Sequence, residues 1–410
     1  MPALFRALAH RNFRFFVLGQ ALSLTGMWIQ MVAQSWLMYQ MTQEAFAVAW
    51  VAIAQQGPGL LVGPFAGALA DRHSRQRMLV FAHAAAIAPA VALAVLVFSG
   101  SASPLLLFAL ALVAGVARAF EIPTRQAFVP ELVTREDIPN AIALNSIVFN
   151  VARLVGPAIG GFIIALAGEA WCFLANAVLL VPVLFSLLAI RVPVRSRLSS
   201  ATSSLLSELA SAVRYVRREP ILWALLGGLA AASVAGMPYT VLLPSFAARV
   251  LDAGPETYGF LTAAVGVGAI LSAVLLATRK QVAGLDAWLV ASGVVFAFGL
   301  FGLSRSTDLG MAVLALAVIG GGFMFLMAAT NTLVQLRVPD ELRGRVMSFH
   351  TALFLGLFPV GGLLAGVLAD RFGEAAVMEA GSFLVGLSVL AFGSILLRNR
   401  SAWKDEPPSG

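Results

Sequence analysis

The chain has 410 residues, of which 60% are hydrophobic and 11% charged, and its mean hydropathy is +0.90. This composition excludes a water-soluble globular domain of this length, because most of the surface must face lipid. A single cysteine, Cys172, excludes an intramolecular disulfide. The net charge of +7 comes from short basic clusters without interleaved aromatic residues, which argues against nucleic-acid binding.

Twelve stretches of the chain can cross a bilayer as helices, which takes about 20 apolar residues each. The first follows a basic amino terminus, runs past signal-peptide length and lacks a small-residue cleavage site, so we expect it to be retained. The charge-free run 78–117 is broken by the turn-forming segment 99–104 and counts as two spans. The segment 138–168 contains one charge, Arg153. The other spans are charge-free runs at residues 15–43, 45–70, 170–190, 220–248, 257–278, 287–304, 309–336, 346–369 and 380–397.

The basic residues predict how these spans are oriented. When the loops are assigned alternately to two sides, one side collects most of the 27 Lys and Arg residues. The other side holds only Arg249, Arg305 and Arg371, while Arg118 and Arg153 fall within spans. Because Lys and Arg accumulate on the cytoplasmic side, we expect a multi-pass inner-membrane protein with both termini in the cytoplasm.

The longest polar stretch follows the sixth span and divides the chain into halves. We expect an amino-terminal six-helix bundle at 1–190, a cytoplasmic linker at 191–219, a carboxy-terminal six-helix bundle at 220–398 and a cytoplasmic tail at 399–410. Within the linker, apolar residues at helical spacing favour an interfacial amphipathic helix, with a solvated tether as the alternative. These apolar residues are Leu206, Leu209, Ala210, Val213 and Val216.

Short segments repeat six spans apart. Residues 134–138 before the fifth span are similar to residues 338–342 before the eleventh, and a helix rich in Gly and Pro follows each of them. Repeats of this kind are typical of transporters that rock one half against the other around a site at the bilayer midplane.

The loop after the second span, residues 67–77, reads GALADRHSRQR. It resembles the signature loop of the major facilitator superfamily, except that Ser74 stands where glycine is usual. In that family the glycine lets spans two and eleven approach closely, and the aspartate faces a helix amino terminus, where the helix dipole favours an anion. A plain basic loop on the cytoplasmic side is the alternative. The resemblance implies a conformational latch made of Gly67, Asp71, Arg72 and Arg75.

The fifth span carries closely spaced small residues and a proline. Glycines four residues apart lie on one helix face and permit close helix contact, and Pro157 can bend the helix. The segment resembles the glycine-proline motif of antiporters in the superfamily, although ordinary small-residue packing is an alternative. The residues concerned are Gly156, Pro157, Gly160 and Gly161.

The sequences at 118–130, 139–146 and 150–153 are similar to the exporter branch that includes the enterobactin exporter and macrolide efflux proteins. This resemblance implies an all-α membrane protein with twelve transmembrane helices in two pseudo-symmetric six-helix bundles. It also implies export of a small amphipathic drug, antibiotic or siderophore by alternating access, with proton antiport. We expect a monomer without a cofactor. The arginine that many drug exporters carry in the outer half of span four is absent, since Ala111 and its neighbours are apolar.

Glu121 is the one acidic residue predicted to lie within the membrane. Arg118 and Arg125 lie on the same helix face, and Arg153 on the next span is a further partner. One hypothesis makes Glu121 the proton-coupling carboxylate, with Arg118 and Arg153 setting its proton affinity. Alternatively, the cluster is a structural ion network, or Pro123 ends the helix early and leaves Glu121 near the cytoplasmic surface.

In the superfamily fold, spans one, four, seven and ten line a central cavity. Uncharged polar groups among Met and aromatic residues suit a large amphipathic ligand, although each residue could equally be a packing residue. The corresponding residues here are Gln30, Gln34, Met237, Tyr239, Met324, Phe325 and Asn331.

Other classes of protein are disfavoured. No phosphate-binding loop of the G-x-x-x-x-G-K-[ST] type occurs, so no nucleotide is expected to drive transport. The four histidines lack the spacing of metal ligands, and no nucleophile motif indicates an enzyme. A lipid or lysolipid flippase on the same scaffold is the main rival to an exporter of small molecules.

Overall fold

The computed structural model describes residues 3–190, 205–279 and 284–398. In these residues twelve helices are long and apolar enough to span a membrane, which confirms the predicted all-α fold, and no strand occurs. The first six spans are α1 (Arg11–Thr42), α2 (Ala45–Arg72), α3 (Arg75–Phe98), α4 (Pro104–Phe128), α5 (Ile138–Ala167) and α6 (Glu169–Ala189). The seventh comprises α8 (Pro220–Ala231), η4 (Ala232–Gly236), α9 (Tyr239–Ser245) and η5 (Phe246–Val250). The last five are α10 (Pro255–Thr278), α11 (Leu285–Ser304), α12 (Leu309–Arg337), α13 (Asp340–Phe372) and α14 (Glu374–Arg398). Shorter elements are η1 (Ala3–Ala9), η2 (Val129–Glu131), η3 (Arg135–Asp137) and α7 (Leu205–Arg218).

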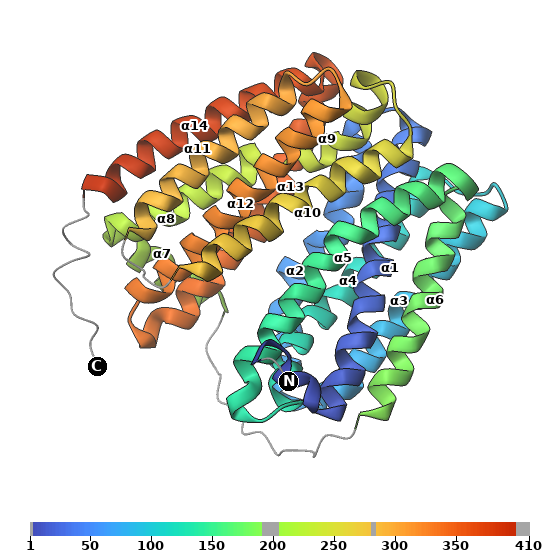
Figure 1. Cartoon of the computed structure of the whole chain (residues 1–410), viewed down its shortest axis with the longest axis horizontal. Coiled ribbons are helices and arrows are strands. Elements are labelled where there is room, and N and C mark those ends of the chain that lie inside the picture. Colours follow the sequence, from blue (N-terminus) through green and yellow to red (C-terminus); the bar gives the residue numbers. More distant parts are fainter. Residues whose placement is uncertain (1–2, 191–204, 280–283, 399–410) are drawn as a thin grey trace. The chain divides into compact units, whose positions relative to one another are not determined.

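The described residues form two compact units, the first within 1–200 and 243–263 and the second within 201–242 and 264–410. In the first unit α1 packs against α2, α5 and α6, while α3 packs against α4 and α6 (Figure 1). In the second unit α11 packs against α12 and α14, and α8 packs against α14. The first unit therefore includes the carboxy-terminal end of the seventh span and the start of α10 as well as the six amino-terminal helices.

The turn between α3 and α4 lies where the sequence predicts it. Ser103 caps α4 by accepting a hydrogen bond from the backbone N–H of Leu106, and Pro104 occupies the first helical turn. Serine satisfies an otherwise unpaired N–H at a helix start, and proline has no N–H to satisfy there. The long apolar run is thereby divided into two spans.

The seventh span is interrupted by two π-helical turns, which the sequence analysis did not predict. The N–H of Met237 donates to the carbonyl of Ala232 over 2.9 Å, and the N–H of Leu251 donates to the carbonyl of Phe246 over 3.2 Å. Pro238 and Pro244 lie between these turns. A proline ring clashes with the carbonyl four residues before it, so a widened turn nearby accommodates the ring.

Part of the linker forms α7, whose apolar side packs in the second unit. Ala212 and Val216 are fully buried in a cluster that also contains Leu225 and Leu333. Arg217 and Arg218, on the last turn, are exposed. The linker residues 191–204 and the tail 399–410 lie outside the described residues, as do the side chains of residues 205–210.

Candidate functional site

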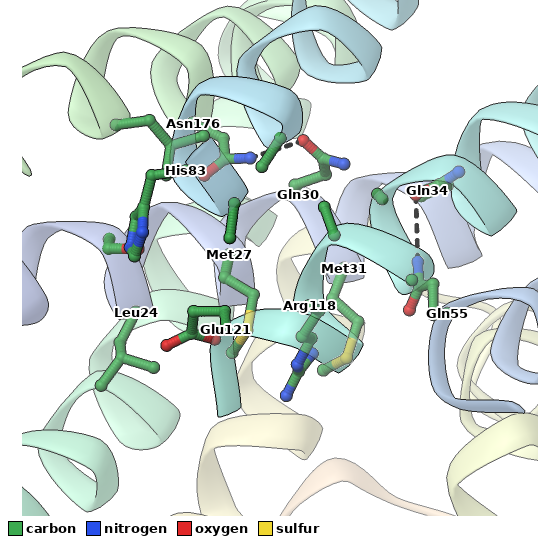
Figure 2. A pocket seen from close by; sticks show the side chains of 17 residues that line it. Leu24, Met27, Gln30, Met31, Gln34, Gln55, His83, Arg118, Glu121 and Asn176 are labelled. Carbon is green, nitrogen blue, oxygen red and sulfur yellow. Dashed lines mark hydrogen bonds between the residues drawn. The ribbon is translucent and has the colours of Figure 1, made fainter. Parts of the chain in front are cut away.

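A pocket lined by both polar and apolar side chains lies in the first unit, and its empty volume is about 750 Å³ including space open to solvent. One face of α1 forms a wall, because residues three and four positions apart lie on the same side of a helix. The α4 wall contributes Arg118 and Glu121, the α3 wall His83, and the α6 wall Asn176 (Figure 2). The α1 residues that face the pocket are Ser23, Leu24, Met27, Gln30, Met31 and Gln34.

Glu121 forms an ion pair with Arg125, one helical turn further along α4. The Nε of Arg125 lies 2.7 Å from the Oε1 of Glu121, and the two side chains are only 9% and 14% exposed. Pro123 lies inside α4, which continues to Phe128, so the helix does not end early at Pro123. A carboxylate in a membrane span needs a nearby cation, and Arg125 supplies it.

Two further side chains interact electrostatically with Glu121. They are His83 on α3 and Arg118, which precedes Glu121 by three residues on α4. The Nδ1 of His83 lies 2.9 Å from the carbonyl oxygen of Leu79, so Nδ1 carries a hydrogen and donates it to that carbonyl. The pocket therefore combines a carboxylate, an imidazole and a guanidinium.

Amide side chains line the other end of the pocket (Figure 2). Asn176 donates to the Oε1 of Gln30 over 2.7 Å. Gln55 donates to the Oε1 of Gln34 over 3.0 Å, and Gln34 donates to the carbonyl of Leu107 over 2.9 Å. These bonds hold the amides in place, because a buried polar group without a partner is costly.

The remaining residues expected to line a central cavity belong to the second unit. Met324 and Phe325 line one pocket of α10 and α12, and Tyr239 lines a larger apolar pocket. Asn331 accepts a hydrogen bond of 2.6 Å from Gln335, and Met237 is half-buried at the π-helical turn. Gln30 and Gln34 are the two expected cavity residues that share the pocket of Glu121.

The loop after the second span is joined to the end of the fourth. The Nη1 of Arg75 donates to the carbonyl of Ala127 over 2.6 Å and to the carboxylate of Glu131 over 3.0 Å. Arg72 is exposed, and a Cβ at Gly67 would meet nothing within 4 Å. The side chain of Asp71 lies outside the described part of the chain.

The glycines of α5 lie at two helix contacts within the first unit. Gly156 and Gly160 face α1, where a Cβ on Gly156 would come within 2.5 Å of the Cβ of Trp28. Gly161 faces the start of α10, where a Cβ would come within 2.7 Å of the carbonyl oxygen of Pro255. Arg153 is half-buried on α5 and has an interaction partner in the structure.

The lining side chains that were not selected from the sequence include three with an amide or an imidazole: His83, Gln55 and Asn176. Each is a polar group within an apolar span, and that alone could have marked it as a candidate. Their pairing depends on α2, α3 and α6 meeting α1 and α4, which no local pattern reveals. In the described residues no group of His, Cys, Asp and Glu could hold a metal ion.

Comparisons with known proteins indicate that the chain is a membrane transporter. The chain matches the family model of transmembrane secretion effectors over residues 3–409. A staphyloferrin A transporter from Staphylococcus aureus is 25% identical over 368 residues, 88% of this chain and 90% of that protein. The enterobactin exporter EntS from Shigella boydii is 29% identical over 401 residues, 95% of this chain and 91% of that protein.

Solved structures of transporters share the fold. A bacterial homologue of the iron transporter ferroportin in an inward-facing state has a TM-score of 0.72 at 16% identity, covering 95% of this chain and 99% of that one. The nucleoside transporter NupG has a TM-score of 0.69 at 13% identity, covering 94% and 99%. At such identities the likeness concerns the fold alone.

Proposed function

The chain belongs to the transmembrane secretion effector family of the major facilitator superfamily and is a membrane transporter rather than an enzyme, and we propose that it exports small amphipathic molecules by proton antiport. The exported compounds include siderophores or drugs of similar character. The protein works as a monomer in the inner membrane, with both termini in the cytoplasm. Its two halves alternate in exposing the binding site to either side of the membrane.

The observation that carries this proposal is the ionisable cluster in the pocket of the first unit. Glu121 is held among Arg125, His83 and Arg118 inside an apolar bundle. A carboxylate in such a place changes its proton affinity when a neighbouring charge moves, because the low dielectric strengthens each interaction. Glu121 can thus take up and release a proton as the surrounding helices shift.

Transport in inverted membrane vesicles tests this proposal. We expect an imposed pH gradient to drive uptake of a fluorescent amphipathic dye by the wild type. Glu121→Gln should abolish the gradient-driven component, because glutamine cannot carry the proton, while counterflow of the dye without a gradient should persist. The two readouts separate a loss of coupling from a loss of folding.

Glu379→Gln serves as the matched control, because Glu379 pairs with the exposed Arg305 outside the pocket. This variant should keep the full gradient-driven rate. Gradient-driven uptake that survives in Glu121→Gln would remove Glu121 from the coupling step. Movement of labelled lysolipid in place of the dye would favour a flippase.

A further inference from the structure

The ion cluster around Glu121, which includes Arg125 beside the pocket, contains more positive than negative charge. Among its charged groups Glu121 is the one acid, and it is paired with Arg125 at 2.7 Å. Arg118 interacts with Glu121 only through space, and in the described residues it has no hydrogen bond or ion-pair partner. Two guanidinium groups therefore face one carboxylate, and the excess positive charge belongs to Arg118.

An excess cation within a membrane span is costly unless a counter-charge reaches it. Arg118 lies on the pocket wall, where Figure 2 shows its guanidinium near Met31 and away from the bonded pairs of amides. Five N–H groups of a guanidinium can bind a planar anion with two oxygens side by side. The site is therefore suited to an anion that enters the pocket.

A further donor lies on the α1 wall of the same pocket. The Oε1 of Gln30 accepts from Asn176, and this fixes the amide so that its own N–H groups remain available. The same α1 face carries the apolar side chains of Leu24, Met27 and Met31. Flexible thioethers adapt to irregular apolar surfaces, so this wall suits the hydrophobic part of a ligand.

We propose that Arg118 is the anchor for a carboxylate or a similar pair of acidic oxygens on the exported molecule. The substrate class is thus an amphipathic organic anion, whose acidic end binds Arg118 and whose apolar part lies on the methionines of α1, while Gln30 can donate to a neutral polar group of the same molecule. This inference rests on the proposed export function. It separates the roles of two neighbouring residues, since Glu121 binds the proton and Arg118 binds the solute.

Equilibrium binding of a matched pair of probes tests this assignment. Dansylglycine carries one carboxylate, and dansylglycinamide is its neutral counterpart of nearly the same shape. Their fluorescence is measured with the purified full-length protein in nanodiscs, with empty nanodiscs as the background. We expect the wild type to bind dansylglycine about tenfold more tightly than the amide, as for one charge-assisted pair.

Substitutions of the two charged residues should act in opposite directions. Arg118→Gln should remove the preference for the acid and leave binding of the amide unchanged. Arg118→Lys should keep part of the preference, because a single ammonium retains the charge without the planar fork. Glu121→Gln should strengthen binding of the acid, because it removes the competing carboxylate. Arg218→Gln, on the exposed side of α7, is the control and should behave as the wild type.

The outcomes separate this inference from the transport proposal. Equal binding of the two probes, no saturable binding of dansylglycine, or a preference that survives in Arg118→Gln would each overturn the assignment of Arg118. Binding that depends on Arg118 without counterflow of dansylglycine in proteoliposomes would leave the anion site intact and refute transport. Dye export that is unchanged in Arg118→Gln, together with equal binding of the probes, would leave transport intact and refute the anion site.

Discussion

Arg75 is a single residue that links the loop after the second span to the end of α4. Its guanidinium donates to the carbonyl of Ala127 and to the carboxylate of Glu131, and it is only 15% exposed. Removing it leaves two partly buried acceptors without this donor, and hydrogen bonds to charged groups contribute about 1.5–3 kcal/mol each. We expect Arg75→Ala to lower the thermal midpoint of the purified protein by several degrees.

Cys172 provides the measurement for this prediction. It is the only cysteine and is completely buried, with its sulfur 3.5 Å from the carbonyl oxygen of Gly160. A thiol-reactive fluorophore should therefore label the protein only as α5 and α6 separate on heating. Arg77→Ala, an exposed arginine in the same loop, is the control and should leave the midpoint unchanged. An equal effect of the two substitutions would show that Arg75 acts through its charge alone.

At the scale of elements, the crossing of α5 and α10 depends on glycine. A Cβ at Gly161 would lie 2.7 Å from the carbonyl oxygen of Pro255, and a Cβ at Gly259 would lie 2.5 Å from the carbonyl oxygen of Pro157. Both obstacles are backbone atoms, which cannot move aside as a flexible side chain can. We expect Gly161→Val to lower the thermal midpoint and to reduce the rate of counterflow.

A glycine substitution elsewhere separates the effect of crowding at this crossing from the effect of helix propensity. A Cβ at Gly386 on α14 would meet nothing within 4 Å. Gly386→Ala should therefore be neutral or stabilising, because alanine is about 1 kcal/mol more favourable than glycine inside a helix. Gly161→Ala should be destabilising, and a gain in its thermal midpoint would mean that the crossing tolerates a wider separation.

The sequence predicts those features of the helices that depend on local properties, and it misses those that depend on how the backbone and the neighbouring helices adjust. Span length and charge content are local properties, so all twelve helices could be predicted, including the division at Ser103 and Pro104. The π-helical turns around Pro238 were missed, because a proline signals a distortion without specifying how the backbone accommodates it. Helix α4 continues through Pro123, so packing by its neighbours outweighs the local penalty.

The candidate site was less predictable than the helices. Glu121 and Arg118 could be found as charges in an apolar span, and the i,i+4 spacing already suggested Arg125. The partnership of Gln34 with Gln55 and that of Gln30 with Asn176 join different helices. Such pairs arise from tertiary packing, and no periodicity within one helix encodes them.

At the scale of the whole molecule, the two halves share a helical scaffold, as the sequence repeat indicates, but they do not carry the same charged residues. In the first half, segment 78–131 (spans three and four) carries His83, Arg118 and Glu121. In the second half the tenth span, residues 309–336, contains no Asp, Glu, Lys or Arg. The pocket lined by Tyr239 in the second unit is formed mainly by apolar residues. A symmetric pair of bundles can therefore confine charge recognition to one half, and the other half can supply an apolar surface.

The orientation of the whole chain can be tested by labelling single cysteines in a Cys172→Ser background. The distribution of Lys and Arg predicts that Arg77 and Arg217 are cytoplasmic and that Ser101 and Thr307 lie on the outer side. All four positions are exposed in the structure, so a reagent can reach each of them from its own side. A membrane-impermeant maleimide should label Ser101→Cys and Thr307→Cys in intact spheroplasts.

The cytoplasmic pair, Arg77→Cys and Arg217→Cys, should react only after the membrane is permeabilised. These variants also report on the mechanism, because a latch around Asp71 can govern access from the cytoplasm only if its loop lies there. Labelling of Arg77→Cys in intact spheroplasts would reverse the orientation. Coupling would be unaffected by that reversal, because an antiporter exchanges inward-moving protons for outward-moving solute in either orientation, but the loop around Asp71 would then lie where it could control access only from the outer side.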